Sequence, residues 1–260
     1  MLGWSINLFR VFGIQLALHA SFLLLLAYAG YDGWREGGPA GMVWNTLLVL
    51  LFFGCVVLHE LGHSLTARRY GVRVPRILLL PIGGMAEMDH IPRKPSTELW
   101  ITVAGPAVNF AIAALLFPLV WYFSGDRDVI LLHSPLGLAY QLLQANLVMG
   151  VFNLLPAFPM DGGRILRALL ARKLPYLRAT YWAVMVGRGV GVLAVSYAVW
   201  EAEYLLAGLF LFILFAGHAE YQQTLRREEE ERYWAEMARR VNEARAGGLQ
   251  PPLIVGGPSE

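Results

Sequence analysis

The length of the uncharged hydrophobic runs restricts the fold of this chain more than any other feature. No charged residue occurs between Glu36 and Glu60, and similar runs recur through most of the first 220 residues. Charged residues make up 15% of the 260 residues and hydrophobic ones 57%, whereas a soluble domain is usually about one quarter charged. A helix needs ~20 predominantly apolar residues to cross a bilayer. The sequence therefore predicts a polytopic membrane protein.

Six segments come close to the length and apolarity of a spanning helix. They are Ile14–Tyr31, Ala40–Ala67, Leu99–Ser124, Pro135–Pro156, Thr180–Trp200 and Tyr204–Ala219. We therefore predict an all-α fold with about six transmembrane helices, the last two of which form an antiparallel hairpin. The N-terminus lacks the basic start and cleavage site of a secretion signal, so we expect the first segment to be retained as a span.

Lysine and arginine are unevenly divided among the loops. They gather after the second segment, after the fourth and in the C-terminal tail, whereas the other loops hold only Arg35 and Arg127. Cytoplasmic loops carry the excess of these residues. An even number of spans then places both termini in the cytoplasm, and so compact a chain is expected in a prokaryotic plasma membrane. Arg188, inside the fifth segment, is expected to face the bundle interior or to snorkel.

Residues 72–91 do not follow the helical pattern. They combine β-favouring residues with two prolines and with the pair Gly83 and Gly84, which predicts a short hairpin or strand at the cytoplasmic membrane face. Such a hairpin could be a simple surface feature. Alternatively, its unpaired edge could bind an extended peptide by strand addition.

The chain is predicted to change character after residue 220. Residues 221–246 read as a charged cytoplasmic helix with i,i+4 pairs such as Arg226–Glu230 and Arg227–Glu231. Residues 247–260 are rich in glycine and proline and are expected to be a disordered tail. Residues 1–220 would then form the transmembrane domain.

Two histidines and a glutamate close the longest uncharged run. His59 and His63 are four residues apart, so they lie on one helix face and can bind a single zinc ion. Glu60 lies between them and can act as general base toward an attacking water and then as proton donor to the leaving amine. A structural cluster of hydrogen-bonded polar groups is the alternative. Ionisable residues in such an apolar segment are by default functional candidates, however.

A catalytic zinc site needs a third protein ligand and an open position. Asp161 is the best candidate because it follows the fourth span on the side of the membrane where His63 is predicted. Two prolines before it would end the helix, and Gly162 and Gly163 would give the backbone room to turn the carboxylate inward. The alternative is that Asp161 caps the following short helix.

These motifs together resemble those of the site-2 protease family of intramembrane metalloproteases. The matching pieces are His59–His63, the stretch Ala104–Asn109, the stretch Asn153–Gly163 and the glycine-bearing stretch Leu80–Ala86. The chain looks most similar to the compact branch whose members carry CBS domains. It is expected to have no such domain, so nucleotide sensing through one is not expected.

The resemblance implies one zinc ion per chain and a role for each matching residue. The implied zinc ligands are His59, His63 and Asp161. Glu60 would be the catalytic acid and base, and Asn153 would polarise the scissile carbonyl or hold the oxyanion. Asn109 would support the site, although a buried asparagine between helices is often only a bridging hydrogen-bond partner. Gly83 and Gly84 would belong to the strand beside the substrate.

The activity that the resemblance implies is hydrolysis of peptide bonds in or near the transmembrane helices of other membrane proteins. This is the chemistry of regulated intramembrane proteolysis, and its partners are a transmembrane substrate and the lipid bilayer. A net charge of +2 gives no reason to expect binding to nucleic acid. The sequence is compatible with assembly into a homo-oligomer. There are two rival interpretations, a zinc transporter and an inactive scaffold. Transporters more often have inverted sequence repeats, and we see no such repeat in this sequence.

Overall fold

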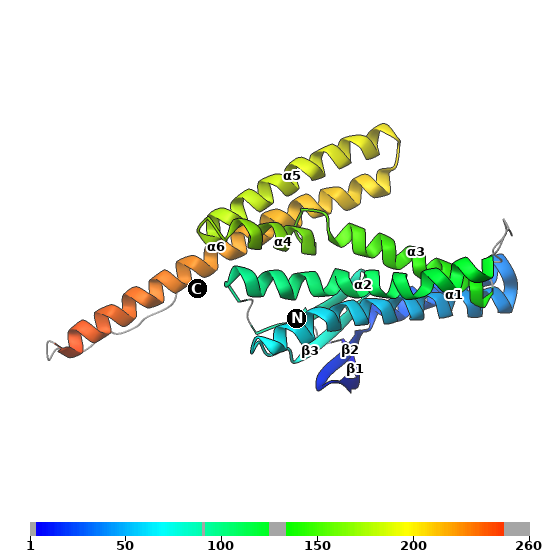
Figure 1. Ribbon diagram of the computed structural model, residues 1–260, viewed down its shortest axis with the longest axis horizontal. Coiled ribbons are helices and arrows are strands. Elements are labelled where there is room, and N and C mark those ends of the chain that lie inside the picture. The colour runs from blue at the N-terminus through cyan, green and yellow to red at the C-terminus, as the bar shows by residue number, and fades with distance from the viewer. Residues whose placement is uncertain (1–3, 90–91, 125–133, 247–260) are drawn as a thin grey trace.

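The computed structural model describes residues 4–89, 92–124 and 134–246, and the predicted tail lies outside them. The elements are β1 (Ser5–Val11), β2 (Ile14–His19), α1 (Ser21–Arg69), β3 (Arg76–Leu80), β4 (Gly83–Glu87), α2 (Pro95–Ser124), α3 (Pro135–Asn153), α4 (Asp161–Leu170), α5 (Tyr176–Trp200) and α6 (Tyr204–Ala246). Long helices form most of the molecule, and a small sheet lies against one side of α1 (Figure 1).

Helix α1 consists of two arms that fold back on each other. The backbone leaves helical geometry at Gly37 and Gly38, and Pro39 follows in the second arm. Gly38 has a φ of 60°, which glycine adopts without the steric cost of a Cβ. The arms touch where Gly33 faces Gly41, because a Cβ added to Gly33 would lie 2.3 Å from the Gly41 carbonyl oxygen. The first two predicted spans are thus arms of one helical hairpin.

The sheet has four strands in the order β1-β2-β3-β4. β1 and β2 are antiparallel, β2 and β3 are parallel, and β3 and β4 are antiparallel, with Ile77 opposite Ala86. The hairpin predicted within residues 72–91 is confirmed as β3 and β4. Because β4 lies at the end of the strand order, its outer edge faces away from the sheet.

The all-α prediction is wrong at the N-terminus, where Ile14–His19 is strand β2 instead of the start of a span. Ile14, Leu16 and Ala17 of this strand are buried. The turn before it has positive φ at Phe12 and Gly13, 50° and 81°, which favours a tight hairpin. The parallel pairing to β3 buries this strand, and burial explains why it reads as one hydrophobic run with the helix that follows.

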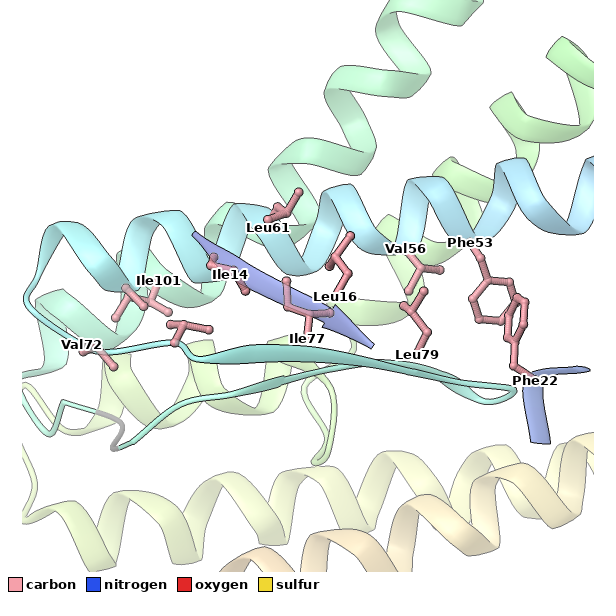
Figure 2. Close-up of a cluster of buried hydrophobic side chains, with 12 residues drawn as sticks. Ile14, Leu16, Phe22, Phe53, Val56, Leu61, Val72, Ile77, Leu79 and Ile101 are labelled. Carbon is pink, nitrogen blue, oxygen red and sulfur yellow. The ribbon is translucent and has the colours of Figure 1, made fainter. Parts of the chain in front are cut away.

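One hydrophobic core lies between the sheet and the second arm of α1. Ile14 and Leu16 of β2 and Ile77 and Leu79 of β3 lie beneath the helix in Figure 2. At one end of the core the ring of Phe22 meets the ring of Phe53 edge to face, with centroids 4.6 Å apart. This packing fixes the sheet against the helical arm that carries the histidine motif.

Four helices among the described residues are long and apolar enough to cross a membrane, so the predicted count of six is not confirmed. They lie within Ser21–Arg69, Pro95–Phe123, Tyr176–Trp200 and Tyr204–Glu243. The two counts differ partly because α1 joins two predicted segments. In addition, Gln141, Gln144 and Asn146 lower the apolar character of α3.

Helices α5 and α6 form the predicted antiparallel hairpin (Figure 1). Arg188 of α5 contacts His218 of α6 at 2.9 Å, so it has a polar partner on the neighbouring helix. The charged segment continues α6 without a break to Ala246. Its i,i+4 ion pairs are Arg232 with Glu228 and Arg240 with Glu236.

The charged segment thus has i,i+4 pairs of the predicted kind, although among the described residues they join other partners than the two examples given above. Glu231 pairs instead with Arg93, at 2.6 Å. Arg93 precedes α2, so this contact joins the charged segment to the helical bundle.

Candidate metal centre

Three potential metal ligands converge between α1 and the start of α4. The Nε2 atoms of His59 and His63 are 3.1 Å apart, and the Asp161 Oδ2 atom lies 3.3 Å from the first and 3.2 Å from the second. The side chains are buried, with relative exposures of 5, 7 and 7%. Helical spacing stacks the two histidines on one face, and an irregular segment after α3 brings the aspartate to them from a distant part of the chain.

The hydrogen bonds at Nδ1 fix the orientation of both imidazole rings. His59 Nδ1 contacts the Asn109 side-chain oxygen, and His63 Nδ1 lies 2.8 Å from the Ile101 carbonyl oxygen. Both partners only accept hydrogen bonds. Each ring therefore donates from Nδ1 and turns Nε2 toward the centre, which is the orientation in which a neutral imidazole binds a metal.

The donor set fits a zinc ion. Two Nε2 lone pairs and a carboxylate oxygen face one another, and Asp161 Oδ2 is buried with no hydrogen bond among the described residues. The space is kept open by Gly105, where a Cβ would lie 2.2 Å from His63 Nε2 and 2.8 Å from His59 Nε2. Two imidazoles and one carboxylate leave a tetrahedral zinc ion with one open position, whereas without a cation these lone pairs would repel one another.

Glu60 lies between the metal ligands and strand β4. Its Oε2 atom accepts a hydrogen bond from the Ala86 backbone N–H at 3.2 Å. A Cβ on Gly84 would lie 2.7 Å from Glu60 Cγ, so glycine is required there for close packing. Gly83 begins β4 with a φ of 138°. Of the predicted glycine pair, Gly84 thus packs against Glu60, whereas a Cβ on Gly83 would meet nothing within 4 Å.

The predicted asparagines differ in their contacts. Asn109 is fully buried and contacts His59. Asn153, at the end of α3, donates from Nδ2 to the Met149 carbonyl of its own helix at 3.0 Å. The sequence reasoning missed Asn146, which is also fully buried and accepts from Asn109 Nδ2 at 3.0 Å. Its only signal in the sequence was an amide within a hydrophobic run.

A second buried polar cluster joins α4 to α2 and α6. Arg167 donates from Nε and Nη2 to Glu98 at 2.8 and 2.6 Å, and from Nη1 to Glu220 at 2.8 Å. Its guanidinium also lies 5.0 Å from the ring centroids of Phe158 and Tyr176. Burial lowers the pKa of Arg167, whereas the neighbouring carboxylates raise it by a larger amount. The pKa of Arg167 is therefore above its usual value.

Comparison with known proteins assigns the family. Residues 47–194 match Peptidase family M50, and the chain belongs to this family. It is 41% identical over 220 residues to zinc metalloprotease MJ0392 of Methanocaldococcus jannaschii, covering 84% of this chain and 61% of that protein. It is 31% identical over 239 residues to the putative zinc metalloprotease Rip3 of Mycobacterium tuberculosis, covering 88 and 59%.

The fold is similar to that of a solved relative. The site-2 protease from Methanocaldococcus jannaschii aligns with a TM-score of 0.60 and 39% identity, covering 84% of this chain and 95% of the solved one. The resemblance predicted from the motifs is therefore confirmed, and zinc is the metal that the relatives' names and the three ligands indicate. The chain spans about three fifths of the length of the two zinc metalloproteases compared above.

Proposed function

We propose that this chain is an intramembrane zinc metallopeptidase that hydrolyses peptide bonds in or near the transmembrane helices of membrane-protein substrates. The observation that carries the proposal is the convergence of His59, His63 and Asp161 beside Glu60, within helices apolar enough to span a bilayer. One relative, 31% identical over 137 residues, is stage IV sporulation protein FB of Bacillus subtilis. Release of a cytosolic factor and clearance of membrane proteins are both compatible with the site.

The proposed roles follow from the chemistry of each group. His59, His63 and Asp161 would hold zinc, which when bound supplies a Lewis acid for amide hydrolysis. Glu60 would take a proton from the attacking water and give it to the leaving amine. Its contact with the Ala86 N–H would hold the carboxylate on the β4 side of the site. Asn153 gives one amide hydrogen to the Met149 carbonyl and would offer the other to the oxyanion.

The substrate is proposed to lie extended along the outer edge of β4. A peptide bond inside a helix is shielded by that helix's own hydrogen bonds, so the substrate must unwind before water can attack. The Ala86 N–H points away from β3 and toward Glu60, so a strand added at this edge would pass beside the catalytic carboxylate. Strand addition of this kind supplies main-chain hydrogen bonds that hold an unwound peptide.

The proposed topology places the site near the cytoplasmic face. Helix α1 would cross the membrane twice, once with each arm, and α2, α3, α5 and α6 would each cross it once. These six spans would place both termini in the cytoplasm. We propose three parts along the chain: a transmembrane metalloprotease domain (1–220), a charged cytoplasmic helix (221–246) and a tail (247–260). The positive-inside rule supports this orientation, because Arg68, Arg69, Arg172 and Lys173 lie at helix ends assigned to the cytoplasm.

Purified protein tests the proposal most directly when zinc content and cleavage of a model transmembrane substrate are measured in wild type and Glu60→Gln. We expect about one zinc per chain in both, because the substitution spares the three ligands. Cleavage should fall by about 10²–10⁴-fold in the variant, the usual contribution of a general acid–base. Equal cleavage by both proteins would refute the role of Glu60, and zinc binding without any cleavage would favour the scaffold or transporter interpretation.

A further inference from the structure

We propose that Asn146 is a positioning residue that fixes the tautomer and orientation of His59 by acting through Asn109. This inference rests on the proposed zinc site and deepens it by assigning a residue on α3 to that site. Asn146 does not touch His59, so its effect must pass through the intervening amide.

The three side chains form one continuous buried line from α3 through α2 to α1. Asn146 and Asn109 have relative exposures of 0%. Asn109 Nδ2 donates to Asn146 Oδ1 at 3.0 Å, and Asn146 Nδ2 donates to the Leu142 carbonyl at 2.8 Å. At the other end, the Asn109 side-chain oxygen meets His59 Nδ1.

The direction of the whole line follows from its anchor at Leu142. A backbone carbonyl can only accept, so the end of the Asn146 amide that faces it must be the NH₂ group. The Asn146 oxygen then faces Asn109 and can only accept, which turns the Asn109 NH₂ group toward it. The Asn109 oxygen is left facing His59, so the ring must donate from Nδ1 and present Nε2 to the metal.

The second histidine, His63, is held in the same orientation without a chain of side-chain amides. His63 Nδ1 lies 2.8 Å from the Ile101 carbonyl oxygen, which belongs to the backbone of α2. No side-chain substitution removes that acceptor. His59 is held by a side-chain amide that could present either end, so its orientation depends on Asn146. The two zinc-binding histidines should therefore respond differently to changes outside the ligand set.

The experiment measures zinc affinity by chelator competition in the purified full chain, with Asn146→Leu, Asn109→Leu and the double variant compared with wild type. We expect Asn146→Leu to weaken zinc binding by about 10–100-fold, the usual effect of losing a partner that orients a metal ligand. The double variant should bind zinc no more weakly than Asn109→Leu alone, because Asn146 acts through Asn109.

The matched control is Gln144→Leu. It removes an amide from the same helix two residues away, where the side chain is exposed and donates to Tyr140. Zinc affinity should be unchanged in this control, and the melting temperature of the zinc-free protein should separate a general loss of packing from a weakened site. Asn146→Ala replaces Asn146→Leu if leucine prevents folding.

The outcomes separate this inference from the proposed function. Wild-type zinc affinity in Asn146→Leu, or independent losses that add in the double variant, would overturn the role of Asn146 while leaving the zinc site intact. Absence of zinc from the wild-type protein would overturn the proposed function itself, and this inference with it.

Discussion

Two buried polar clusters lie in this helical bundle, and they differ in how their charges are balanced. In the metal centre, the Asp161 carboxylate faces the Nε2 atoms of His59 and His63 at 3.3 and 3.2 Å. In the second cluster, Arg167 lies between the carboxylates of Glu98 and Glu220. Both clusters take one member from α4, so the same short helix contributes to each.

This difference in charge balance distinguishes a ligand-binding site from a polar cluster that only stabilises the fold. A buried charge is costly unless it is paired, and the second cluster contains its own counter-charge. Glu98 also lies in the first turn of α2, where the helix dipole favours an acidic side chain. The three residues of the metal centre are instead a set of ligands for a metal ion. We therefore expect the first cluster to determine activity and the second to determine stability.

The largest effect is expected from Asp161→Ala. The substitution removes one of three ligands, and the loss of Lewis-acid catalysis should lower cleavage by about 10³-fold or more. Zinc content measured by atomic absorption should fall with it. Glu236→Ala, which removes an exposed carboxylate on the outer part of α6, should leave both unchanged. Normal zinc content in Asp161→Ala would show that this carboxylate is not a ligand.

Arg167→Met should break the second cluster without touching the first. Removing one member of a buried ion pair leaves an uncompensated charge, and the free energy of unfolding should fall by about 3–5 kcal/mol. Denaturant unfolding in detergent micelles measures this loss. Adding Glu98→Gln should recover part of it, because the buried charge is then removed as well.

Arg240→Met is the matched control for the buried arginine. Arg240 pairs with Glu236 on the exposed face of α6, and such surface pairs contribute only about 0.2–1 kcal/mol. If Arg167→Met and Arg240→Met cost the same, the second cluster does not stabilise the fold in the way argued above.

The sequence predicted the metal centre better than the second cluster, for a physical reason. Spacing along one helix places His59 beside His63, which is a local rule, whereas Asp161 was assigned to them from the predicted order of spans and from the family motif that contains it. The partner of Arg167 lies 69 residues away on α2. Nothing in the local pattern selects one carboxylate from several, and Arg167 therefore contributed to the sequence analysis only as a positive charge.

The same distinction explains the errors in the fold. The β3–β4 hairpin was predicted because its prolines and glycines punctuate a short segment. Strand β2 was missed although one of its partners, β1, directly precedes it in the chain, because a buried strand that is followed at once by an apolar helix gives a single hydrophobic run. Asn146 was missed because its role depends on which amide lies opposite, and this is decided by the packing of α3 on α2.

Removal of zinc should destabilise the wild-type protein while leaving the second cluster unaffected. A ligand that binds only the folded state at about 100 times its Kd adds about 2.7 kcal/mol of stability. A chelator should therefore lower the melting temperature of wild type and of Arg167→Met by similar amounts, and it should leave Asp161→Ala unchanged. A chelator effect that persists in Asp161→Ala would place the stabilising metal elsewhere in the molecule.

The smallest effect is expected from Gly84→Ala, which disturbs the geometry of the metal centre without removing a ligand. The added Cβ would lie 2.7 Å from Glu60 Cγ and 3.1 Å from Val56 Cγ1, so the catalytic carboxylate must shift or β4 must move away. We expect cleavage to fall by about tenfold, because misplacement of a reacting group is costly, with zinc content unchanged. Gly54→Ala on α1, where a Cβ would meet nothing within 4 Å, is the matched control.

Wild-type cleavage in Gly84→Ala would show that the contact between Glu60 and β4 does not position the carboxylate. The proposal that the substrate lies along β4 would then lose its main support.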